Sequence, residues 1–380
     1  MILRRDRPTV AHILAQYPSI TETFIAQYLG HLATFDSVVV CMQNAGTTNG
    51  LQPCLLGVYA VENIWRRWTL AWLLGRLDAR LLRRPPYVLY VRSILARHNI
   101  RLLHAHFGPQ GVWALPLKRA AGLPLVTTFY GYDMSMLPRQ DAWQRQYQAL
   151  FAQGDLFLVA GPHMAKGLVS LGCPAEKVQI QHIAIDLDAV PFRPRRLEAG
   201  ERARILFCGR FTEKKGLPYA LQAMAMVSKK YPHVELRVIG DGPLRGAIEE
   251  TIARLGIQDQ VTLLGYQPYE RFVEELQRAH ILLAPSVTGE NGDSEGGAPT
   301  VILEAQAAGL PVVTTYHADI PYIVSEGESA LLAPERDSGA LATHILQLVA
   351  HPDRWEGMGR AGRRWVEERH NIRVEAKRLE

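Results

Sequence analysis

The chain has 380 residues, of which 48% are hydrophobic and 21% charged, and its formal net charge at pH 7 is +5. This length exceeds the usual size of one domain and predicts two. The composition is ordinary for a globular protein and argues against a disordered or fibrous chain. No apolar run reaches the roughly 18 residues that span a bilayer, so we expect no transmembrane helix.

The cysteines and the first residues predict a reducing compartment. The 4 cysteines are widely spaced and form no C-x-x-C pair, which argues against a structural zinc site or a disulfide framework. The apolar stretch near the start is too short for a secretion signal and continues into a predicted strand. We therefore expect the protein in the cytoplasm.

Short β-branched runs alternate with amphipathic stretches along the chain. In the first half, strands are predicted at 9–16, 36–43, 100–108, 124–131, 155–161 and 177–186, with helices at 21–33, 110–122 and 163–172. In the second half, strands are predicted at 204–210, 234–242, 260–266, 281–286, 311–315 and 329–334, with helices at 216–231, 243–256, 269–279 and 299–309. This alternation is typical of βαβ units that build parallel sheets with helices on both faces.

A charged, proline-rich segment without periodicity separates the two series. We therefore predict an α/β protein with two Rossmann-like, doubly wound domains at 1–186 and 204–365, joined by a linker at 187–203. Ligands of open α/β sheets bind at the carboxyl ends of the strands. Two such domains facing each other would place these ends across one cleft.

Much of the positive charge lies at 62–101, a stretch that contains nine arginines, no lysine and only two acids, Glu62 and Asp78. The arginines alternate with Trp, Leu and Ile at roughly helical spacing. Basic amphipathic helices with tryptophans suit an anionic membrane surface, but the pattern also fits two ordinary helices with solvated arginine faces. Both interpretations stay open. No nucleic-acid-binding motif accompanies the stretch, so we expect no nucleic-acid partner.

The stretch YPSITETFI, residues 17–25, gathers hydroxyls and a carboxylate where a helix should begin. One interpretation is helix capping by Thr21. The other is a site for a sugar or a phosphate, in which free backbone amides face the phosphate and Glu22 meets hydroxyl groups. The two interpretations are compatible.

The stretch FCGRFTEKKGL, residues 207–217, follows a predicted strand and opens a helix. Gly209 permits a tight turn, and Arg210 and Lys215 lie near a helix N-terminus that already favours an anion. Two cations at such a terminus suit a diphosphate. The lysine lacks the frame and the following Ser or Thr of a Walker loop. A basic surface turn is the alternative.

The stretch VIGDGPLRG, residues 238–246, places three glycines after a strand. Its spacing is one residue too long for a dinucleotide fingerprint. We interpret it as a tight strand-to-helix turn rather than as a nicotinamide site.

The stretch GENGDSEGGAPTVILEAQAAGLPVVTT, residues 289–315, is a glycine-rich acidic loop that opens a helix. Backbone amides of such a loop can contact a phosphate. Carboxylates repel phosphate but accept hydrogen bonds from sugar hydroxyls, so Glu304 could hold a ribose and Glu295 a hexose. A flexible acidic loop with one exposed helical glutamate is the alternative.

In their order and spacing, these three stretches resemble the retaining glycosyltransferases of family 4, which have the GT-B fold. That family shows G-R-x-x-x-x-K-G, then V-x-G-x-G-P, then E-G-x-P-x-x-x-x-E-A-x-A-x-G-x-P-V. The resemblance covers about residues 203–365 and implies that Arg210 and Lys215 bind the donor diphosphate. It also implies that Glu304 binds the ribose and Glu295 the donor sugar. A final helix at 366–380 would cross back to the first domain.

The two glutamates depart from the family pattern by one extra residue between them. Alignment on Pro299 places Gly296 where the first glutamate is expected. Either a bulge returns Glu295 to that place, or the backbone amides of Gly296 and Gly297 make the contact instead.

The first half resembles a branch of this family that builds bacterial exopolysaccharide, colanic acid and lipopolysaccharide. In that branch F-P-x-x-S-E-T-F-I corresponds to YPSITETFI. The stretch HAHFGPQG, residues 104–111, resembles the family's strand-end histidine motif, and the resemblance places His106 near the reacting sugar; a core histidine is the alternative. Asp133 is retained from T-x-H-G-x-D, whereas Tyr130 replaces the usual histidine. His104 and His106 share a strand face, but a metal site needs more ligands, so we expect none.

The resemblance implies transfer of a sugar from a nucleotide-diphosphate donor to a glycan or lipid-linked acceptor, without a metal or another cofactor. Charge stabilisation of the leaving diphosphate would drive the reaction, and no general base is assigned. Contact with the inner face of the cell membrane through 62–101 belongs to this hypothesis. Two alternatives stay open: a nucleotide-sugar dehydrogenase or epimerase, and an inactive nucleotide-binding partner.

Overall fold

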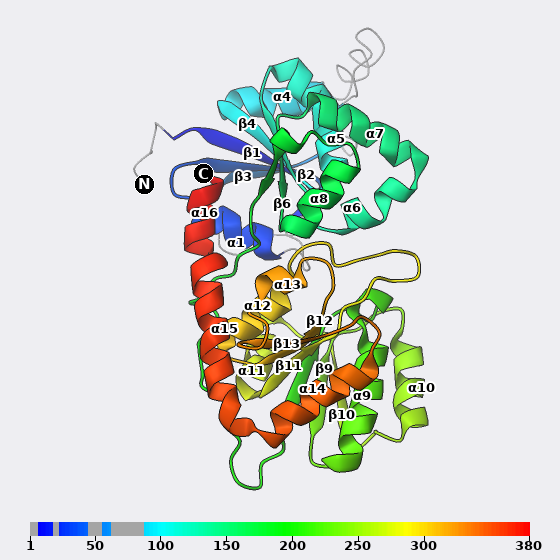
Figure 1. The fold of residues 1–380 in the computed structure, drawn as a ribbon. Coiled ribbons are helices and arrows are strands. Elements are labelled where there is room, and N and C mark those ends of the chain that lie inside the picture. Colours follow the sequence, from blue (N-terminus) through cyan, green and yellow to red (C-terminus); the bar gives the residue numbers. More distant parts are fainter. Residues whose placement is uncertain (1–6, 18–22, 45–54, 62–86) are drawn as a thin grey trace. The chain divides into compact units, whose positions relative to one another are not determined.

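The structure is a computed structural model that describes residues 7–17, 23–44, 55–61 and 87–380 (Figure 1). The chain forms two compact units, which are described separately below. The first unit comprises residues 1–181 together with 372–380, and the second comprises 182–371. Within the described residues, no helix combines the length and the apolar character needed to cross a membrane.

The first unit is built on a parallel sheet of seven strands in the order β3-β2-β1-β4-β5-β6-β7. Val38, Val39 and Val40 of β2 are fully buried, as expected for parallel strands that are covered on both faces. The strands are β1 (Thr9–Tyr17), β2 (Asp36–Asn44), β3 (Leu55–Ala60), β4 (Ile100–His106), β5 (Leu125–Thr128), β6 (Leu156–Val159) and β7 (Val178–Ile180).

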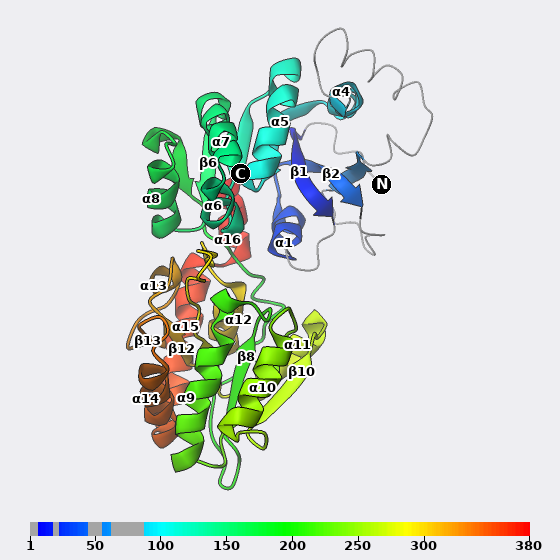
Figure 2. The same cartoon turned by 90° about the vertical axis from the view of Figure 1, so that its right-hand side faces the viewer.

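Helices cover this sheet on both faces (Figures 1 and 2). They are α1 (Thr23–His31), α4 (Tyr87–Arg97), α5 (Gly108–Ala121), α6 (Tyr132–Ser135), α7 (Asp141–Gln153), α8 (Pro162–Ser170) and α16 (Ile372–Leu379). Helix α5 packs on β4 and β5, whereas α16 lies against α1. A Cβ at Gly111 of α5 would lie 2.7 Å from the Thr127 hydroxyl, so Thr127 faces α5. Because successive strand residues point to opposite faces, the even-numbered residues of β5 face the other way.

The second unit contains a parallel sheet of six strands in the order β10-β9-β8-β11-β12-β13. The strands are β8 (Arg204–Cys208), β9 (Glu235–Ile239), β10 (Val261–Gly265), β11 (Ile281–Ala284), β12 (Val312–Thr315) and β13 (Ala330–Ala333). The helices are α9 (Leu217–Lys230), α10 (Arg245–Leu255), α11 (Tyr269–Arg278), α12 (Thr300–Ala308), α13 (Ile320–Ile323), α14 (Ser338–Ala350) and α15 (Trp355–Arg369). The prediction of two Rossmann-like, doubly wound domains is confirmed.

The sequence suggested one continuous helix at the end of the chain, but the structure has two helices with a break between them. Helix α15 ends at Arg369 and α16 begins at Ile372. The intervening His370 is 1% exposed, and its Nδ1 lies 2.7 Å from the backbone oxygen of Ile183. Asn371 forms a bridge with Ile185. These contacts to a preceding segment fix the break, and helical periodicity alone gives no sign of it.

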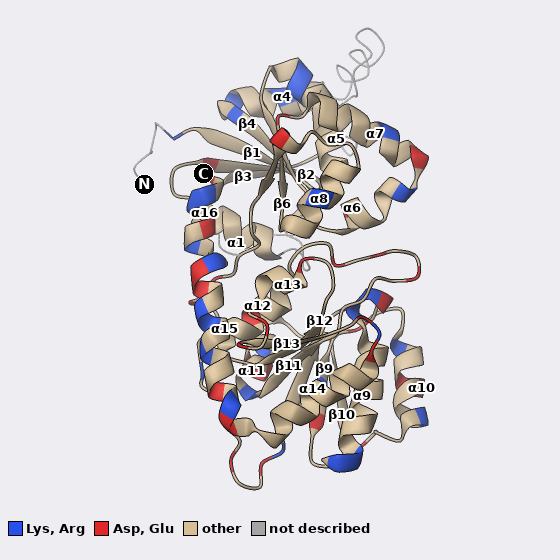
Figure 3. Ribbon diagram, in the orientation of Figure 1, with Lys and Arg blue, Asp and Glu red and all other residues tan. Residues whose placement is uncertain are grey.

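The basic stretch is described only in part, because 62–86 lies outside the described residues. Helix α4 buries Val88, Val91, Ile94 and Leu95. Arg92 and Arg97 of this helix are exposed, and Figure 3 marks basic residues along α4. In this portion the apolar side of the helix packs inside the protein.

Candidate functional site

The candidate site in the second unit is built on the loop that connects β8 to α9. It holds Gly209, a short 3-10 helix at Glu213–Lys215, and Gly216. Gly216 has φ 68°, and a Cβ there would lie 1.8 Å from the backbone oxygen of Pro285. Only glycine fits this conformation and this close approach. The loop is thereby held against the segment that follows β11.

The turn after β9 supports this loop from the other side. Gly240 has φ 139°, and a Cβ there would lie 2.0 Å from the backbone oxygen of Gly209. The backbone nitrogen of Phe211 donates to the Asp241 oxygen at 2.9 Å. The glycines of VIGDGPLRG thus form the predicted tight turn, and α10 begins at Arg245, two residues later than the sequence suggested.

An ion pair joins the loop to the glycine-rich acidic segment. Lys215 Nζ lies 2.7 Å from Glu295 Oε1, and the side chains are 23% and 8% exposed. The Ser286 hydroxyl donates to the same carboxylate at 3.1 Å. Burial is the largest influence and by itself would raise the pKa of Glu295, but Lys215, helped by Lys214 and His317, holds that pKa below its usual value. The structure therefore brings together two residues predicted to meet the donor.

His317 completes this arrangement and was missed by the sequence analysis. Its Nε2 accepts a hydrogen bond from the Glu295 backbone nitrogen at 3.1 Å, so the ring proton is on Nδ1. Nδ1 donates to Glu335 Oε1 at 2.6 Å. His317 is 1% exposed and follows the end of β12 by two residues. Its position just past a strand end was the signal that could have found it.

Lys214, next to Lys215, was missed as well. Its Nζ lies 3.0 Å from Asp293 Oδ1 and 3.2 Å from the Ser294 backbone oxygen. The backbone nitrogen of Val287 donates to the Lys214 oxygen at 2.9 Å. Two consecutive lysines therefore hold the acidic segment against the β8–α9 loop.

Glu304 lies in α12 and is 7% exposed. Burial raises its pKa to about 8, although a hydrogen bond from the Tyr269 hydroxyl opposes part of that rise. The Cys208 thiol, at the end of β8, interacts electrostatically with both Glu304 and Lys215. Glu304 and Lys215 thus lie around one strand end, and Glu304 carries its proton at neutral pH.

The other predicted residues of this unit are placed differently. Arg210 is exposed, and its guanidinium has no ion-pair partner among the described residues. Gly296 has φ 73°, and its backbone nitrogen donates to the Ser294 hydroxyl at 3.2 Å. The Gly297 nitrogen donates to the Glu295 oxygen at 3.0 Å. Whether the Glu295 side chain or these amides meet the donor sugar stays a prediction.

Asp133 in the first unit is fully buried and satisfied by backbone donors. Its Oδ2 accepts from the Gly108 nitrogen at 2.9 Å, and its Oδ1 accepts from the nitrogens of Tyr130 and Gly131 at 3.1 and 2.9 Å. Burial raises its pKa, and these hydrogen bonds oppose the rise. In this structure Asp133 fixes the turn after β5 against the start of α5. A contact with substrate stays a prediction.

His106 ends β4 and is 4% exposed. Its Nδ1 lies 2.8 Å from the Tyr130 hydroxyl, and its Nε2 lies 3.1 Å from His12 Nδ1. Tyr130, which occupies the position where the family has histidine, is thus a hydrogen-bond partner of His106. Thr21 and Glu22, the remaining predicted residues, lie outside the described residues.

Comparisons with known proteins agree with this architecture. Residues 24–189 match the family model described as Glycosyltransferase Family 4, and residues 202–351 match that described as Glycosyl transferases group 1. Together the two models cover most of both units. Each half of the chain thus matches a glycosyltransferase family model.

Curated relatives point to one branch of the family. The chain is 35% identical over 246 residues to the putative colanic acid biosynthesis glycosyltransferase WcaL of Salmonella typhimurium, covering 64% of this chain and 60% of that protein. It is 36% identical over 245 residues to the amylovoran biosynthesis glycosyltransferase AmsK of Erwinia amylovora, with 64% and 60% covered. The chain thus matches about three fifths of the length of these relatives.

Solved structures share the fold over nearly the whole chain. A sucrose-phosphate synthase of Thermosynechococcus elongatus superimposes with a TM-score of 0.77 at 18% identity, covering 98% of this chain and 97% of that one. Anabaena HepE, solved in complex with UDP, gives 0.77 at 16% identity with 98% of each chain covered. At these identities the likeness establishes the fold alone.

Proposed function

We propose that this protein is a retaining glycosyltransferase that moves a sugar from a nucleotide-diphosphate donor to a glycan or lipid-linked acceptor in bacterial surface polysaccharide synthesis. The matches to the two family models and the activities that give the relatives their names support the reaction class. The observation that carries the proposal is the grouping of Lys215, Glu295 and Glu304 around the end of β8. Strand ends of this kind are where open α/β sheets bind ligands.

In the proposed reaction, the bond between the anomeric carbon and the diphosphate oxygen breaks. The acceptor oxygen bonds to the anomeric carbon from the same face, and its proton passes to the departing phosphate. Lys215 and Arg210 stabilise the negative charge that develops on the diphosphate. Glu304 hydrogen-bonds the ribose, and Glu295, released from Lys215 when the diphosphate arrives, accepts hydrogen bonds from the donor sugar. The resemblance to the family assigns contacts with the reacting sugar to His106 and Asp133 as well, and for these two residues the assignment rests on that resemblance. The protein's own cations balance the charge, so the proposed reaction uses no metal or other cofactor.

The experiment is transfer by the purified protein from a panel of UDP- and GDP-sugars, with mass spectrometry of the products. Lys215→Ala should lower turnover by about 10³-fold, because one charge-stabilising donor contributes on that order. Glu304→Ala should weaken donor binding. Lys229→Ala, an exposed lysine of α9, is the matched control and should keep full activity. Normal turnover in either site variant would refute the assignment.

We also propose that the basic stretch 62–101 contacts an anionic membrane surface at the inner face of the cell membrane, with the protein otherwise cytoplasmic. Its nine arginines and the exposed Arg92, Arg97 and Arg101 support this. Sedimentation with liposomes should show binding only when anionic lipid is present. Added salt should weaken it, and binding that ignores salt would contradict the electrostatic basis.

A further inference from the structure

Three histidines of the first unit share one face of the sheet. His104 and His106 are two residues apart in β4, so their side chains point to the same side. His12 of β1 is the register partner of His104 on the neighbouring strand. All three are at most 4% exposed. Sequence spacing reveals the first pair, but only the register of β1 against β4 adds His12.

The ring nitrogens of this histidine cluster converge. One nitrogen from each of His12, His104 and His106 lies within 4.8 Å of the other two. Their ring centroids are 4.3 to 5.4 Å apart. Tetrahedral zinc bound at about 2.0–2.1 Å needs its nitrogens somewhat closer, which small side-chain rotations would supply. At present His12 and His106 instead share the hydrogen bond described above.

Neighbouring hydroxyls hold two of the rings in orientation. His104 Nε2 lies 2.7 Å from Thr128 Oγ1, and His106 Nδ1 lies 2.8 Å from the Tyr130 hydroxyl. Metal-binding histidines characteristically donate their second ring N–H to such a partner, which leaves the other nitrogen for the ion. His12 Nε2 is buried and has no hydrogen-bond partner among the described residues. A buried nitrogen of this kind costs stability unless something binds it.

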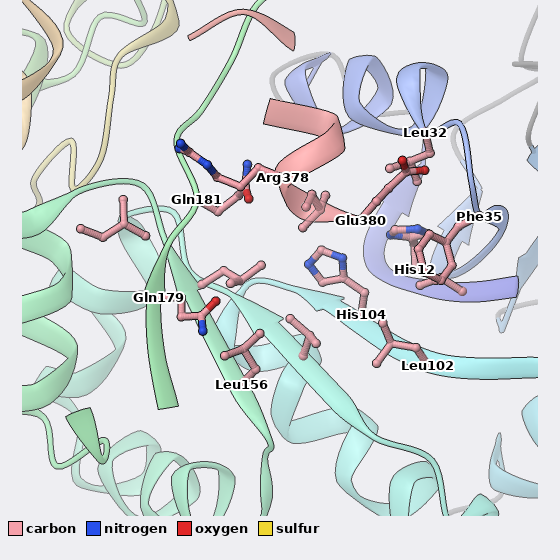
Figure 4. A pocket seen from close by; sticks show the side chains of 15 residues that line it. His12, Leu32, Phe35, Leu102, His104, Leu156, Gln179, Gln181, Arg378 and Glu380 are labelled. Atoms are coloured by element: carbon pink, nitrogen blue, oxygen red, sulfur yellow. The ribbon is translucent and has the colours of Figure 1, made fainter. Parts of the chain in front are cut away.

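A cavity of about 200 Å³ opens beside the cluster. His12 and His104 line it, and Figure 4 shows the His104 ring directed from β4 into it, with Arg378 and Glu380 from the end of the chain nearby. The rest of its wall comes from apolar side chains and from two glutamines of the β7 region, Gln179 and Gln181. The space is large enough for water, so it offers a route to the cluster and room for a fourth ligand.

We propose that His12, His104 and His106 bind one divalent transition-metal ion, foremost Zn²⁺, with the fourth coordination position open to the cavity. Three imidazoles and an open position form a donor set that zinc commonly takes. Mg²⁺ and Ca²⁺ prefer oxygen ligands and are disfavoured here. This proposal differs from the expectation of no metal, which rested on two histidines, and it uses none of the second-unit residues proposed to bind the donor.

Burial lowers the pKa of His104 to about 4. Burial and the neighbouring rings also lower the pKa values of His12 and His106.

The test is titration of untagged, chelator-treated full-length protein with Co²⁺, followed by competition with Zn²⁺. We expect one equivalent to bind, with the intense visible absorption of four-coordinate cobalt, and Zn²⁺ to displace it and to raise the melting temperature. His12→Gln keeps a polar side chain of similar reach but removes one ligand. It should weaken binding by at least roughly 100-fold, more than the loss of a mere ligand-orienting partner.

His351→Gln, an exposed histidine of the second unit, is the matched control and should leave the cobalt spectrum unchanged. Lys215→Ala should also leave it unchanged, which separates this test from that of the transferase. Should His12→Gln fail to fold by circular dichroism, His104→Gln provides the same comparison. Absence of stoichiometric binding to the unaltered protein, or binding that persists in the folded ligand variant, would overturn the proposal.

Discussion

The two units bury their polar groups in different charge states. In the second unit, Lys215 and Glu295 form a partly buried ion pair, and Lys214 pairs with Asp293 beside it. In the first unit, His12, His104 and His106 are buried as neutral rings held by hydrogen bonds to one another and to hydroxyls. If both proposals hold, two sheets of the same topology class bind opposite kinds of ligand, an anion in the second unit and a cation in the first.

The two units therefore differ in the interaction that has to break before a ligand binds. A lysine that is already paired must exchange its carboxylate for an incoming anion, so the ligand has to compete with an internal salt bridge. The imidazoles of the first unit have no ion pair to exchange, and only the hydrogen bond between His12 and His106 has to break before they meet a cation. The fold supplies the strand ends in both cases, whereas the side chains on them decide between anion and cation.

The largest effect is expected from loss of the ion pair between Lys215 and Glu295. Its loss tests whether the pair contributes to stability, to activity or to both. Lys215→Ala leaves Glu295 buried without its cation, which should cost about 3 kcal/mol of folding free energy in addition to the loss of turnover. The double variant Lys215→Ala/Glu295→Gln should regain most of the stability but none of the activity. Urea denaturation and turnover of both variants measure the two effects. Recovery of activity in the double variant would show that Lys215 acts only by neutralising Glu295.

Local sequence signals explain why Lys215 and Glu295 could each be predicted while the contact between them could not. The glycines and cations of FCGRFTEKKGL place a phosphate-binding loop, and the alternating hydrophobic pattern gives both sheets. The contact to Glu295 joins residues 80 positions apart and depends on how the segment after β11 folds back. His317 and His12 were missed for the same reason, because each meets its partners through strand order rather than through spacing. Asp133 was placed at the sugar by resemblance, but both of its oxygens are occupied by backbone donors.

Glu304 provides the second test, because it is a buried carboxyl whose pKa is raised where that of Glu295 is lowered. The folded protein keeps a proton on Glu304 up to about pH 8, whereas the unfolded chain releases it near pH 4.5. Stability should therefore fall as pH rises from about 5 to about 8, by up to ~1.4 kcal/mol per pH unit, and then level off.

Denaturation midpoints between pH 5 and pH 9 measure this slope. Glu304→Gln should remove its contribution and leave the protein more stable than the wild type at pH 8. Tyr269→Phe removes the hydroxyl that stabilises the ionised carboxylate and should shift the slope to higher pH. A pH profile identical in wild type and Glu304→Gln would show that the carboxyl ionises freely.

Substitution of Asp133 tests how much its buried carboxylate contributes to the stability of the first unit. Asp133→Ala leaves the buried backbone nitrogens of Gly108, Tyr130 and Gly131 without their acceptor. At roughly 1–3 kcal/mol for each lost partner, we expect a destabilisation of at least about 3 kcal/mol. Asp133→Asn keeps one acceptor oxygen and should cost less. Hydrogen exchange of peptides from residues 104–135 localises the effect, and unchanged protection in the alanine variant would contradict it.

The smallest expected effect concerns Arg210, the predicted diphosphate ligand that is exposed. Because its guanidinium has no ion-pair partner among the described residues, Arg210→Ala should change the folding free energy by no more than about 0.5 kcal/mol. Under the proposed function, its loss should still weaken binding of the donor's nucleoside diphosphate about 10-fold, since a charge-assisted contact with phosphate contributes on the order of 1.5 kcal/mol. Calorimetric titration with UDP and with uridine separates the contributions of the diphosphate and the nucleoside. Only the affinity for UDP, which carries the diphosphate, should fall. Arg254→Ala, another exposed arginine of the same unit, should alter neither affinity. Equal weakening of uridine and UDP would mean that Arg210 acts away from the diphosphate, and Lys215 would then be left as the main cation of the site.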